Sequence, residues 1–221
     1  MIARPFLLPL GPDRPGMREK FIKAVLANQS AFGLELDHRI FDRLADHYEL
    51  VIAANPLLHL VAPCPPEQFA TRHVLESLSM LKNLPRGAAF TDVGTGGGFP
   101  SIPCLLVRDD LKAQLIESKV KKASFLEFAL ERLGLDRRAS VVNKQFEEAS
   151  PGDHGYVICR ALDKFTEKLP KLLKWSGRRE MLFFGGNNLR KELEKRNIGF
   201  SADLLPMSER RFLFILETQK P

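Results

Sequence analysis

Residues 90–100 hold four glycines within five positions, and this stretch limits what the chain can fold into more than any other. Residues 89–93 before it read as a short buried strand, and the residues after it can begin a helix. Glycine reaches positive φ and lets a ligand approach the backbone closely. A strand, a glycine turn and a helix start hold nucleotide-like ligands in doubly wound α/β proteins. The stretch therefore predicts an α/β fold with a ligand site at this turn.

The hydrophobic pattern changes in character at this point of the chain. Before it, apolar residues recur at helical spacing over 18–30, 37–54 and 67–82, with Asn55-Pro56 expected to end the second helix. After it, strands alternate with helices. The expected strands are 89–93, 114–117, 140–142, 156–159, 180–184, 200–205 and 212–217. The expected helices between them are 102–107, 120–133, 162–175 (split or kinked by Pro170) and 189–196.

These elements predict a Rossmann-like α/β fold with a mostly parallel seven-stranded sheet, an antiparallel final pair of strands and an N-terminal helical cap. We expect residues 1–86 to form an N-terminal tail and the cap. Residues 87–221 are expected to form the ligand-binding core, and the two parts together one compact unit.

Composition excludes several classes of protein. No apolar run approaches the roughly 18 residues of a membrane span. The five histidines and three cysteines show no metal-ligand spacing, so we expect no metal. Three scattered cysteines favour a reducing compartment, and we expect a cytoplasmic protein. The net charge of +6 favours an anionic partner such as RNA without requiring one.

Two ligand classes compete for the glycine turn. A dinucleotide fingerprint needs a third glycine where this chain has Phe99, and Asp92 would face a phosphate. The spacing Asp92-x-Gly94-x-Gly96-x-Gly98 instead resembles motif I of class I S-adenosylmethionine (SAM) methyltransferases. SAM carries an amino group and a sulfonium and no phosphate, so a nearby carboxylate suits it. Glu117 closes the second strand, where it can accept both ribose hydroxyls.

A closer resemblance covers the chain from about residue 39 onward. Residues 92–103, with Pro100-Ser101-Ile102-Pro103, resemble the signature of the ribosomal small-subunit methyltransferase G family (GidB). Residues 72–77, 117–126, 146–148 and 160–161 resemble its other segments. The resemblance implies an enzyme that uses SAM, yields S-adenosylhomocysteine and methylates N7 of a guanine in 16S rRNA of the small ribosomal subunit. We expect the protein to be a monomer.

The resemblance also implies site residues. The family's SAM contacts carry over to five positions, which are Gly94, Phe99, Phe146, Glu147 and Arg160. Two family motifs are missing. His59-Leu60-Val61 stands where the family has Asn-Leu-Thr, and Phe184-Gly185-Gly186 stands where it has Leu-Lys-Gly. These departures concern the RNA side of the pocket more than the cofactor side.

The chemistry expected for N7 explains why no catalytic dyad is visible. N7 of guanine has an in-plane lone pair, so methyl transfer needs no general base and depends on positioning. Arg160 is the candidate catalytic residue, through the cofactor, a guanine edge or a phosphate. Lys119, Lys121 and Lys122 begin a helix beside the pocket and are candidates for RNA binding.

His73 and Glu76 are spaced three apart on a helix, and we expect them to form a structural pair that closes the cap over the pocket. Three alternatives to the rRNA methyltransferase stay open. They are a SAM-dependent methyltransferase with another substrate, a non-enzymatic RNA- or ribosome-binding module on a degenerate methyltransferase fold, and an NAD-dependent oxidoreductase.

Overall fold

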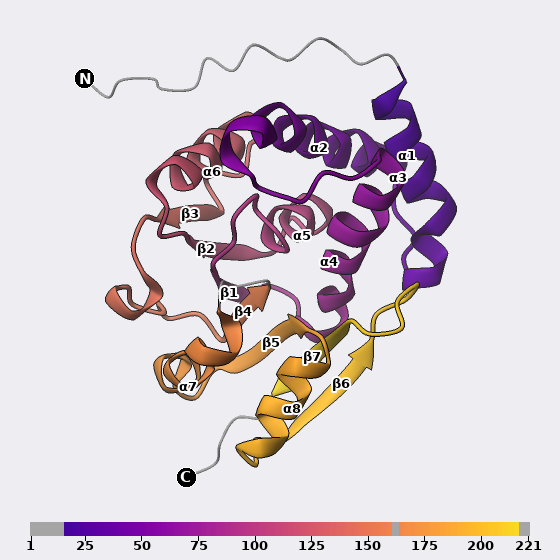
Figure 1. Cartoon of the computed structure of the whole chain (residues 1–221). Helices are drawn as coiled ribbons and strands as arrows, with labels where there is room; N and C mark the ends of the chain where they lie inside the picture. Colours follow the sequence, from indigo (N-terminus) through magenta and orange to yellow (C-terminus); the bar gives the residue numbers. More distant parts are fainter. Residues whose placement is uncertain (1–15, 161–163, 217–221) are drawn as a thin grey trace, which may run out of the picture.

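The computed structural model describes residues 16–160 and 164–216 and contains a seven-stranded sheet in the order β3-β2-β1-β4-β5-β7-β6 (Figure 1). The strands are β1 (Ala89–Val93), β2 (Lys112–Ile116), β3 (Ala139–Val142), β4 (Tyr156–Arg160), β5 (Glu180–Gly185), β6 (Phe200–Leu204) and β7 (Phe212–Leu216). β1 is an inner strand, where Asp92 pairs with Leu115 of β2 on one side and Ile158 of β4 on the other.

The strand directions confirm the expected sheet. β1 to β5 pair in parallel, β7 runs antiparallel to β5, and β6 runs antiparallel to β7. β7 therefore lies between β5 and β6. The strand order reverses at β1, because β2 and β3 lie on one side of it and β4 and β5 on the other. A crevice at the carboxyl ends of β1, β2 and β4 is where such sheets bind ligands.

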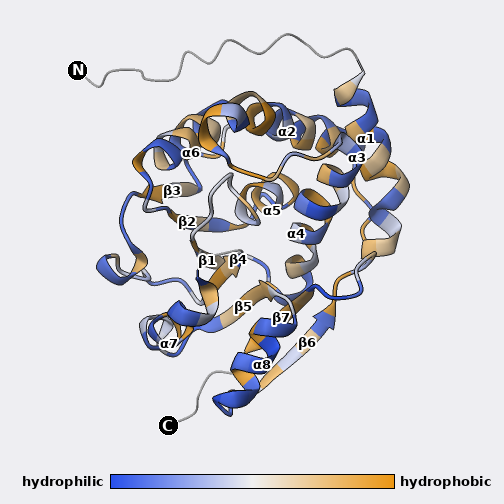
Figure 2. Ribbon diagram, in the orientation of Figure 1, coloured by the Kyte–Doolittle hydropathy of each residue, from blue (hydrophilic) through white to orange (hydrophobic). Residues whose placement is uncertain are grey.

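Two hydrophobic clusters fill the two faces of the sheet. α5 (Ser101–Val107) and α6 (Val120–Arg132) cover one face, and their cluster continues into the cap. α7 (Phe165–Ser176) and α8 (Asn187–Lys195) cover the other face with a smaller cluster that includes Leu169, Leu172 and Phe183. Figure 2 shows the apolar inner strands and the polar outer surfaces of these helices. No helix among the described residues is long and apolar enough to cross a membrane.

The helical cap packs on α5 and α6, above the first half of the sheet (Figure 1). It contains α1 (Met17–Asn28), η1 (Gln29–Phe32), α2 (His38–Leu58), α3 (Pro66–Phe69), η2 (Ala70–Leu75), α4 (Glu76–Leu78) and η3 (Ser79–Asn83). Phe21 stacks on Tyr48 with ring centroids 4.7 Å apart, and Phe69 meets Phe99 of the glycine turn. Cap and core thus share one apolar cluster, while the boundary at residues 86–87 stays a prediction.

The structure corrects three expectations about helices. α2 continues through Asn55-Pro56 to Leu58, because Pro56 lies in the last turn, where the helix is about to end. Residues 66–83 form one helical path, but Ala70–Leu75 within it is a π-helical segment. Pro170 does not split α7, whose neighbouring Leu169 and Leu172 are buried against the sheet.

Three expected features lie wholly or partly outside the described residues. They are residues 1–15 of the expected tail, the predicted start of a helix at residue 162 and the last residue of the 212–217 strand. The three cysteines all lie within the described part, where Cys104 and Cys159 are buried.

Candidate functional site

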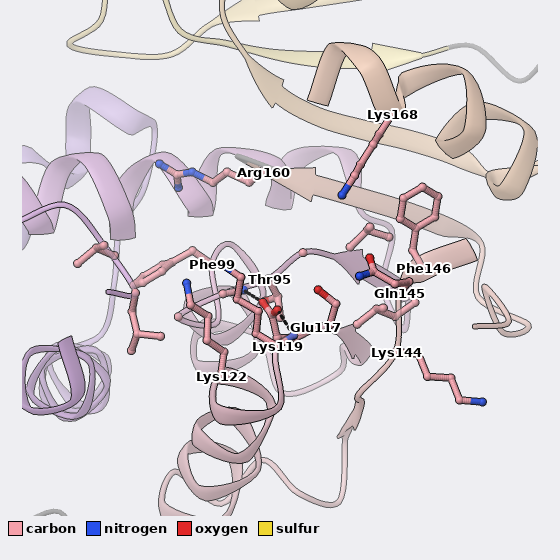
Figure 3. Close-up of a pocket in the computed structure, with 18 of the residues that line it drawn as sticks. Thr95, Phe99, Glu117, Lys119, Lys122, Lys144, Gln145, Phe146, Arg160 and Lys168 are labelled. Carbon is pink, nitrogen blue, oxygen red and sulfur yellow. Dashed lines mark hydrogen bonds between the residues drawn. The ribbon is translucent and has the colours of Figure 1, made fainter. Parts of the chain in front are cut away.

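A cavity of about 510 Å³ lies at the carboxyl edge of the sheet, beside β1, β2 and β4 (Figure 3). Its volume falls in the range of roughly 300–1,000 Å³ usual for small-molecule sites. Its walls come from the glycine turn, the ends of β2 and β4, the start of α6, the segment after β3, α7 and the cap loop at residues 60–62. The cavity therefore lies where the strand order reverses.

Local backbone geometry explains the glycines of the turn. Gly94, Gly96 and Gly98 have φ of 75°, 56° and 89°, a region that other residues rarely adopt. The Gly94 N–H donates to Ile116 O at 2.9 Å, which ties the turn to the end of β2. Gly94 and Gly96 line the cavity, but Gly98 does not. At Gly98 a Cβ would lie 2.8 Å from Ile102 Cγ1, so this glycine lets the turn pack against α5.

Asp92 lies behind the turn and not on the cavity wall. Its carboxylate is fully buried and accepts a hydrogen bond from Ser101 Oγ at 2.5 Å. Burial raises the pKa of Asp92 to about 7, and hydrogen bonding to Ser101 opposes this rise. The geometry gives Asp92 a role in joining the end of β1 to the start of α5. A direct contact between Asp92 and a cofactor stays a prediction.

Glu117 follows β2 and lines the cavity as expected. Its Oε2 accepts from Gly96 N at 3.1 Å, and its Oε1 accepts from Lys119 N at 2.8 Å. Each carboxylate oxygen keeps a further lone pair, so the group can also accept two hydroxyls of a ligand. The two backbone bonds fix the orientation of the carboxylate before any ligand arrives.

The cap holds the outer side of the glycine turn. Nε2 of the buried His47 on α2 donates to Gly97 O at 2.9 Å, because a carbonyl can only accept. Burial lowers the pKa of His47 to about 4, so the ring is neutral at pH 7. Phe99, which lines the cavity, packs between the rings of His47, Phe69 and His73. The turn is thus clamped between α5 and the cap.

Arg160, at the end of β4, reaches from the cavity wall into the cap (Figure 3). Its guanidinium donates to Ser77 Oγ at 2.9 Å, to the Arg72 carbonyl and to Glu76 Oε2 at 3.1 Å. Burial lowers the pKa of Arg160 from its ordinary value, and Glu76 opposes this. The guanidinium therefore links β4 to the π-helical segment, and its predicted catalytic contact stays a prediction.

His73 and Glu76 have separate partners. The buried Glu76 carboxylate bonds Arg160 with one oxygen and Arg211 with the other, the latter at 2.8 Å from Arg211 Nε. His73 lines the cavity beside Phe99. Burial and the nearby charge of Arg160 lower the pKa of His73 to about 3. The expected pairing of these two residues is replaced by an arginine–carboxylate–arginine network.

The remaining predicted site residues divide into two groups. Phe146, Lys119 and Lys122 line the cavity. Glu147, in η4 (Phe146–Glu148), and Lys121 are exposed and lie off its wall. Their predicted contacts with the cofactor and with RNA stay predictions.

Sequence reasoning missed several cavity residues. The main ones are Ala62, Lys144, Gln145 and Lys168. Lys144 and Gln145 could have been found, because they follow a parallel strand of the expected sheet. Ala62, in the 60–62 loop, and Lys168 gave no local signal. Asn55 orders that loop by accepting from Leu60 N and Val61 N at 2.8 and 3.0 Å.

Comparison with known proteins agrees with this geometry. The family model described as rRNA small subunit methyltransferase G matches residues 40–212. A Ribosomal RNA small subunit methyltransferase G of Sorangium cellulosum is 36% identical over 142 residues, which are 63% of this chain and 57% of the relative. The protein of that name from Ruegeria pomeroyi is 31% identical over 168 residues, 73% of this chain and 80% of the relative.

The chain thus spans little more than half the length of the Sorangium relative. Among solved structures, the human methyltransferase 10 domain containing protein aligns with a TM-score of 0.54. The alignment covers 79% of this chain and 97% of that chain at 12% identity, so the likeness shows the fold alone.

The strand order, the glycine turn after β1 and the carboxylate after β2 are those of the Rossmann-like fold of class I methyltransferases. Within this class, the chain belongs to the rRNA small subunit methyltransferase G family.

Proposed function

We propose that this chain transfers a methyl group from SAM to N7 of a guanine in 16S rRNA of the small ribosomal subunit. Family membership and a cavity of suitable size at the expected edge of the sheet support the proposal. SAM supplies an electrophilic methyl group on a sulfonium, and S-adenosylhomocysteine is the product. The residues of the cavity would bind SAM and the guanine and orient them for the transfer.

The cavity residues fit SAM. Glu117 would accept the ribose hydroxyls, because its oriented carboxylate keeps lone pairs free of its two backbone bonds. The backbone of Gly94 and Gly96 allows close approach, and Phe99 and Phe146 offer apolar surface. For Asp92 and Gly98, which lie off the wall, we propose that they support SAM binding by shaping the turn.

One observation carries the choice of N7 as the acceptor: among the described residues that line the cavity, no carboxylate or histidine is suited to act as a base. Among its described lining residues, the only carboxylate is Glu117, which is engaged by Gly96 N and Lys119 N. In the described part of the lining the only histidine is His73, and its lowered pKa makes it a weak base. N7 attacks with its own lone pair and gives up no proton before transfer. An exocyclic amine or a ribose hydroxyl must lose a proton.

The remaining roles concern orientation. Arg160, held by Ser77 and Glu76, would fix the cap above the cavity so that N7 and the methyl group meet in line. Lys119 and Lys122 line the cavity, and Lys121 lies outside it on the same helix, where it would meet RNA at the margin. The macromolecular partner is then the small subunit or its 16S rRNA, met by a monomer of this chain in the cytoplasm.

Methyl transfer with labelled SAM tests the proposal. Unmethylated small subunits and naked 16S rRNA would be incubated with the protein, digested and analysed for N7-methylguanosine. We expect this nucleoside from at least one substrate. SAM, and not NAD, should raise the melting temperature, which separates the proposal from an oxidoreductase. If neither RNA is methylated, the proposed activity is refuted. Tight SAM binding without any transfer would then favour the non-enzymatic binding module.

A second candidate is a SAM-dependent methyltransferase with another substrate. The cap wall favours it, because Leu60, Val61 and Ala62 make that wall largely apolar. The first two belong to His59-Leu60-Val61, which stands where the family usually has Asn-Leu-Thr. Mapping the product decides between the two. A methylated base other than N7-methylguanine, or label in another molecule, would favour the second candidate.

A further inference from the structure

The cavity lining carries more positive charge than the binding of SAM requires. Its described lining contains four lysines, Lys119, Lys122, Lys144 and Lys168, and one carboxylate, Glu117. Arg160 adds a further charge, but Glu76 pairs with it at 3.1 Å. SAM carries a sulfonium, an ammonium and one carboxylate, so its binding adds positive charge. One carboxylate can neutralise at most one lysine, and the excess calls for an anionic partner at the mouth of the cavity.

The lysines lie on different walls. Lys119 and Lys122 stand at the start of α6, while Lys168 reaches in from α7 on the opposite side (Figure 3). Lys144 follows β3, and its side chain points away from the others (Figure 3). Lysines therefore face the cavity from both sides of the space that a nucleotide would enter.

Lys168 differs from Lys122 in having no partner. Lys122 Nζ donates to His59 O at 3.1 Å. For the Lys168 side chain, the described residues provide neither a hydrogen bond nor an ion pair, although the residue is partly buried. A lysine ammonium on a cavity wall without a carboxylate partner favours a ligand with a compact negative charge such as phosphate.

We propose that Lys168 binds a backbone phosphate of the RNA beside the target nucleotide, on the side of the cavity opposite Lys119. This inference rests on the proposed function. A base that reacts in a closed pocket leaves its stack, and its flanking phosphates then cross the mouth of the pocket. A lysine on each wall can hold the phosphates on both sides of the extruded nucleotide. Such contacts fix position and do not read sequence.

Lys168→Gln tests the proposal, with Lys171→Gln as the matched control. Lys171 lies on the same helix, is exposed and does not line the cavity. Filter binding of purified 16S rRNA would be measured at several KCl concentrations, together with SAM affinity by calorimetry. The loss of one phosphate contact lowers the slope of log K against log[KCl] by about 0.7–0.9. We expect this change for Lys168→Gln alone, with SAM affinity within about twofold of wild type.

A conservative variant distinguishes the loss of the positive charge from a structural effect of the substitution. Lys168→Arg keeps the positive charge, so we expect it to restore the salt slope. In methylation assays the KM for RNA should rise about 5- to 20-fold in Lys168→Gln, as expected for one charge-assisted contact of roughly 1–2 kcal/mol, and recover in Lys168→Arg.

Two results would overturn the inference. Weakened SAM binding with an unchanged salt slope would assign Lys168 to the carboxylate of SAM. An unchanged slope and unchanged SAM affinity would make it a solvated surface charge. The binding measurements need no turnover, so they are readable even if the wild-type protein fails to methylate rRNA. That failure would refute the proposed function and not the phosphate contact.

Discussion

Single residues of the glycine turn have distinct physical tasks. Gly94 and Gly96 line the cavity, while Gly98 and Asp92 face the protein interior and hold the turn on α5. His47 bonds the carbonyl of Gly97 from the opposite side. Replacements in this short stretch should therefore separate into those that affect ligand binding and those that affect folding.

Gly98→Ala should destabilise the protein more than Gly134→Ala. Both glycines have positive φ, 89° and 66°, so both variants carry backbone strain of about 1–2 kcal/mol. Only at Gly98 would the new Cβ also crowd a side chain, the buried Ile102, and overpacking adds about 1–3 kcal/mol. Urea unfolding of both variants measures the difference. Equal losses would show that Ile102 moves aside freely.

Glu117→Gln should weaken SAM binding by roughly tenfold to a hundredfold. The amide keeps one acceptor oxygen but loses the charge and the second acceptor, and bonds to charged groups contribute about 1.5–3 kcal/mol. Calorimetric titration with SAM measures the loss. Glu127→Gln, an exposed position on α6 away from the cavity, is the control. Equal affinity of the two variants would contradict a role for Glu117 in holding the ribose.

The sequence predicted the cavity residues that follow strands better than those of the cap loop and of α7. Gly94, Gly96, Phe99, Glu117 and Phe146 follow strands, and the edge at which parallel strands end is fixed by topology. The direction of a long side chain is not fixed in this way. Arg160 was placed correctly at the end of β4, but its partners lie more than 80 residues earlier in the chain.

At the scale of elements, the π-helical segment η2 connects the cap to the sheet. Its residue His73 lines the cavity, and Glu76, just after it, binds Arg160 of β4 and Arg211 near β7. The spacing of the buried apolar residues in this segment indicates a π-helix, whereas the sequence expectation was an ordinary α-helix. Buried Phe69 and Val74 are five residues apart, a step that suits a π turn better than an α turn.

Glu76→Gln should lower the free energy of unfolding by roughly 2–4 kcal/mol. Loss of one partner leaves buried arginines uncompensated, and the partial exposure of Arg211 keeps the effect in the lower part of the usual range. Glu192→Gln removes the surface ion pair with Arg196 and should cost less than about 1 kcal/mol. Chemical denaturation of both variants measures the contrast. Similar small losses would mean that water replaces the buried carboxylate.

Other elements depended on packing that local patterns do not encode. The alternation of strands and helices predicted all seven strands, and the antiparallel final pair is confirmed. The continuity of α2 through Pro56 and of α7 through Pro170 was not predictable from propensity, because tertiary contacts offset the missing backbone bond. The placement of the 60–62 loop depends on the Asn55 side chain.

At the scale of the whole molecule, buried ionisable groups make stability depend on pH. His47 is fully buried, and its pKa in the folded protein is about 4, below the ordinary 6.5. The unfolded chain therefore binds a proton first as pH falls. The stability from neutral His47 is complete above pH 6.5 and is lost as pH falls towards 4.

His47→Gln should remove much of this acid sensitivity. The amide can still donate to Gly97 O but does not titrate. Between pH 6.5 and 4 the wild type should lose stability on the order of 3 kcal/mol more than the variant. Denaturant unfolding at pH 7, 5.5 and 4.5 measures the difference. Parallel losses in the two proteins would show that other groups, such as His73, control the acid limb.

The clamp on the glycine turn makes the cap a partner in ligand binding. His47 joins α2 to the turn, and Arg160 joins β4 to the π-helical segment. A ligand that binds only the closed arrangement opposes its local opening. Amide hydrogen exchange in α2 and η2, which lie mostly outside the cavity, should therefore slow when the cofactor binds, and the cap would report occupancy of the site through its exchange rate.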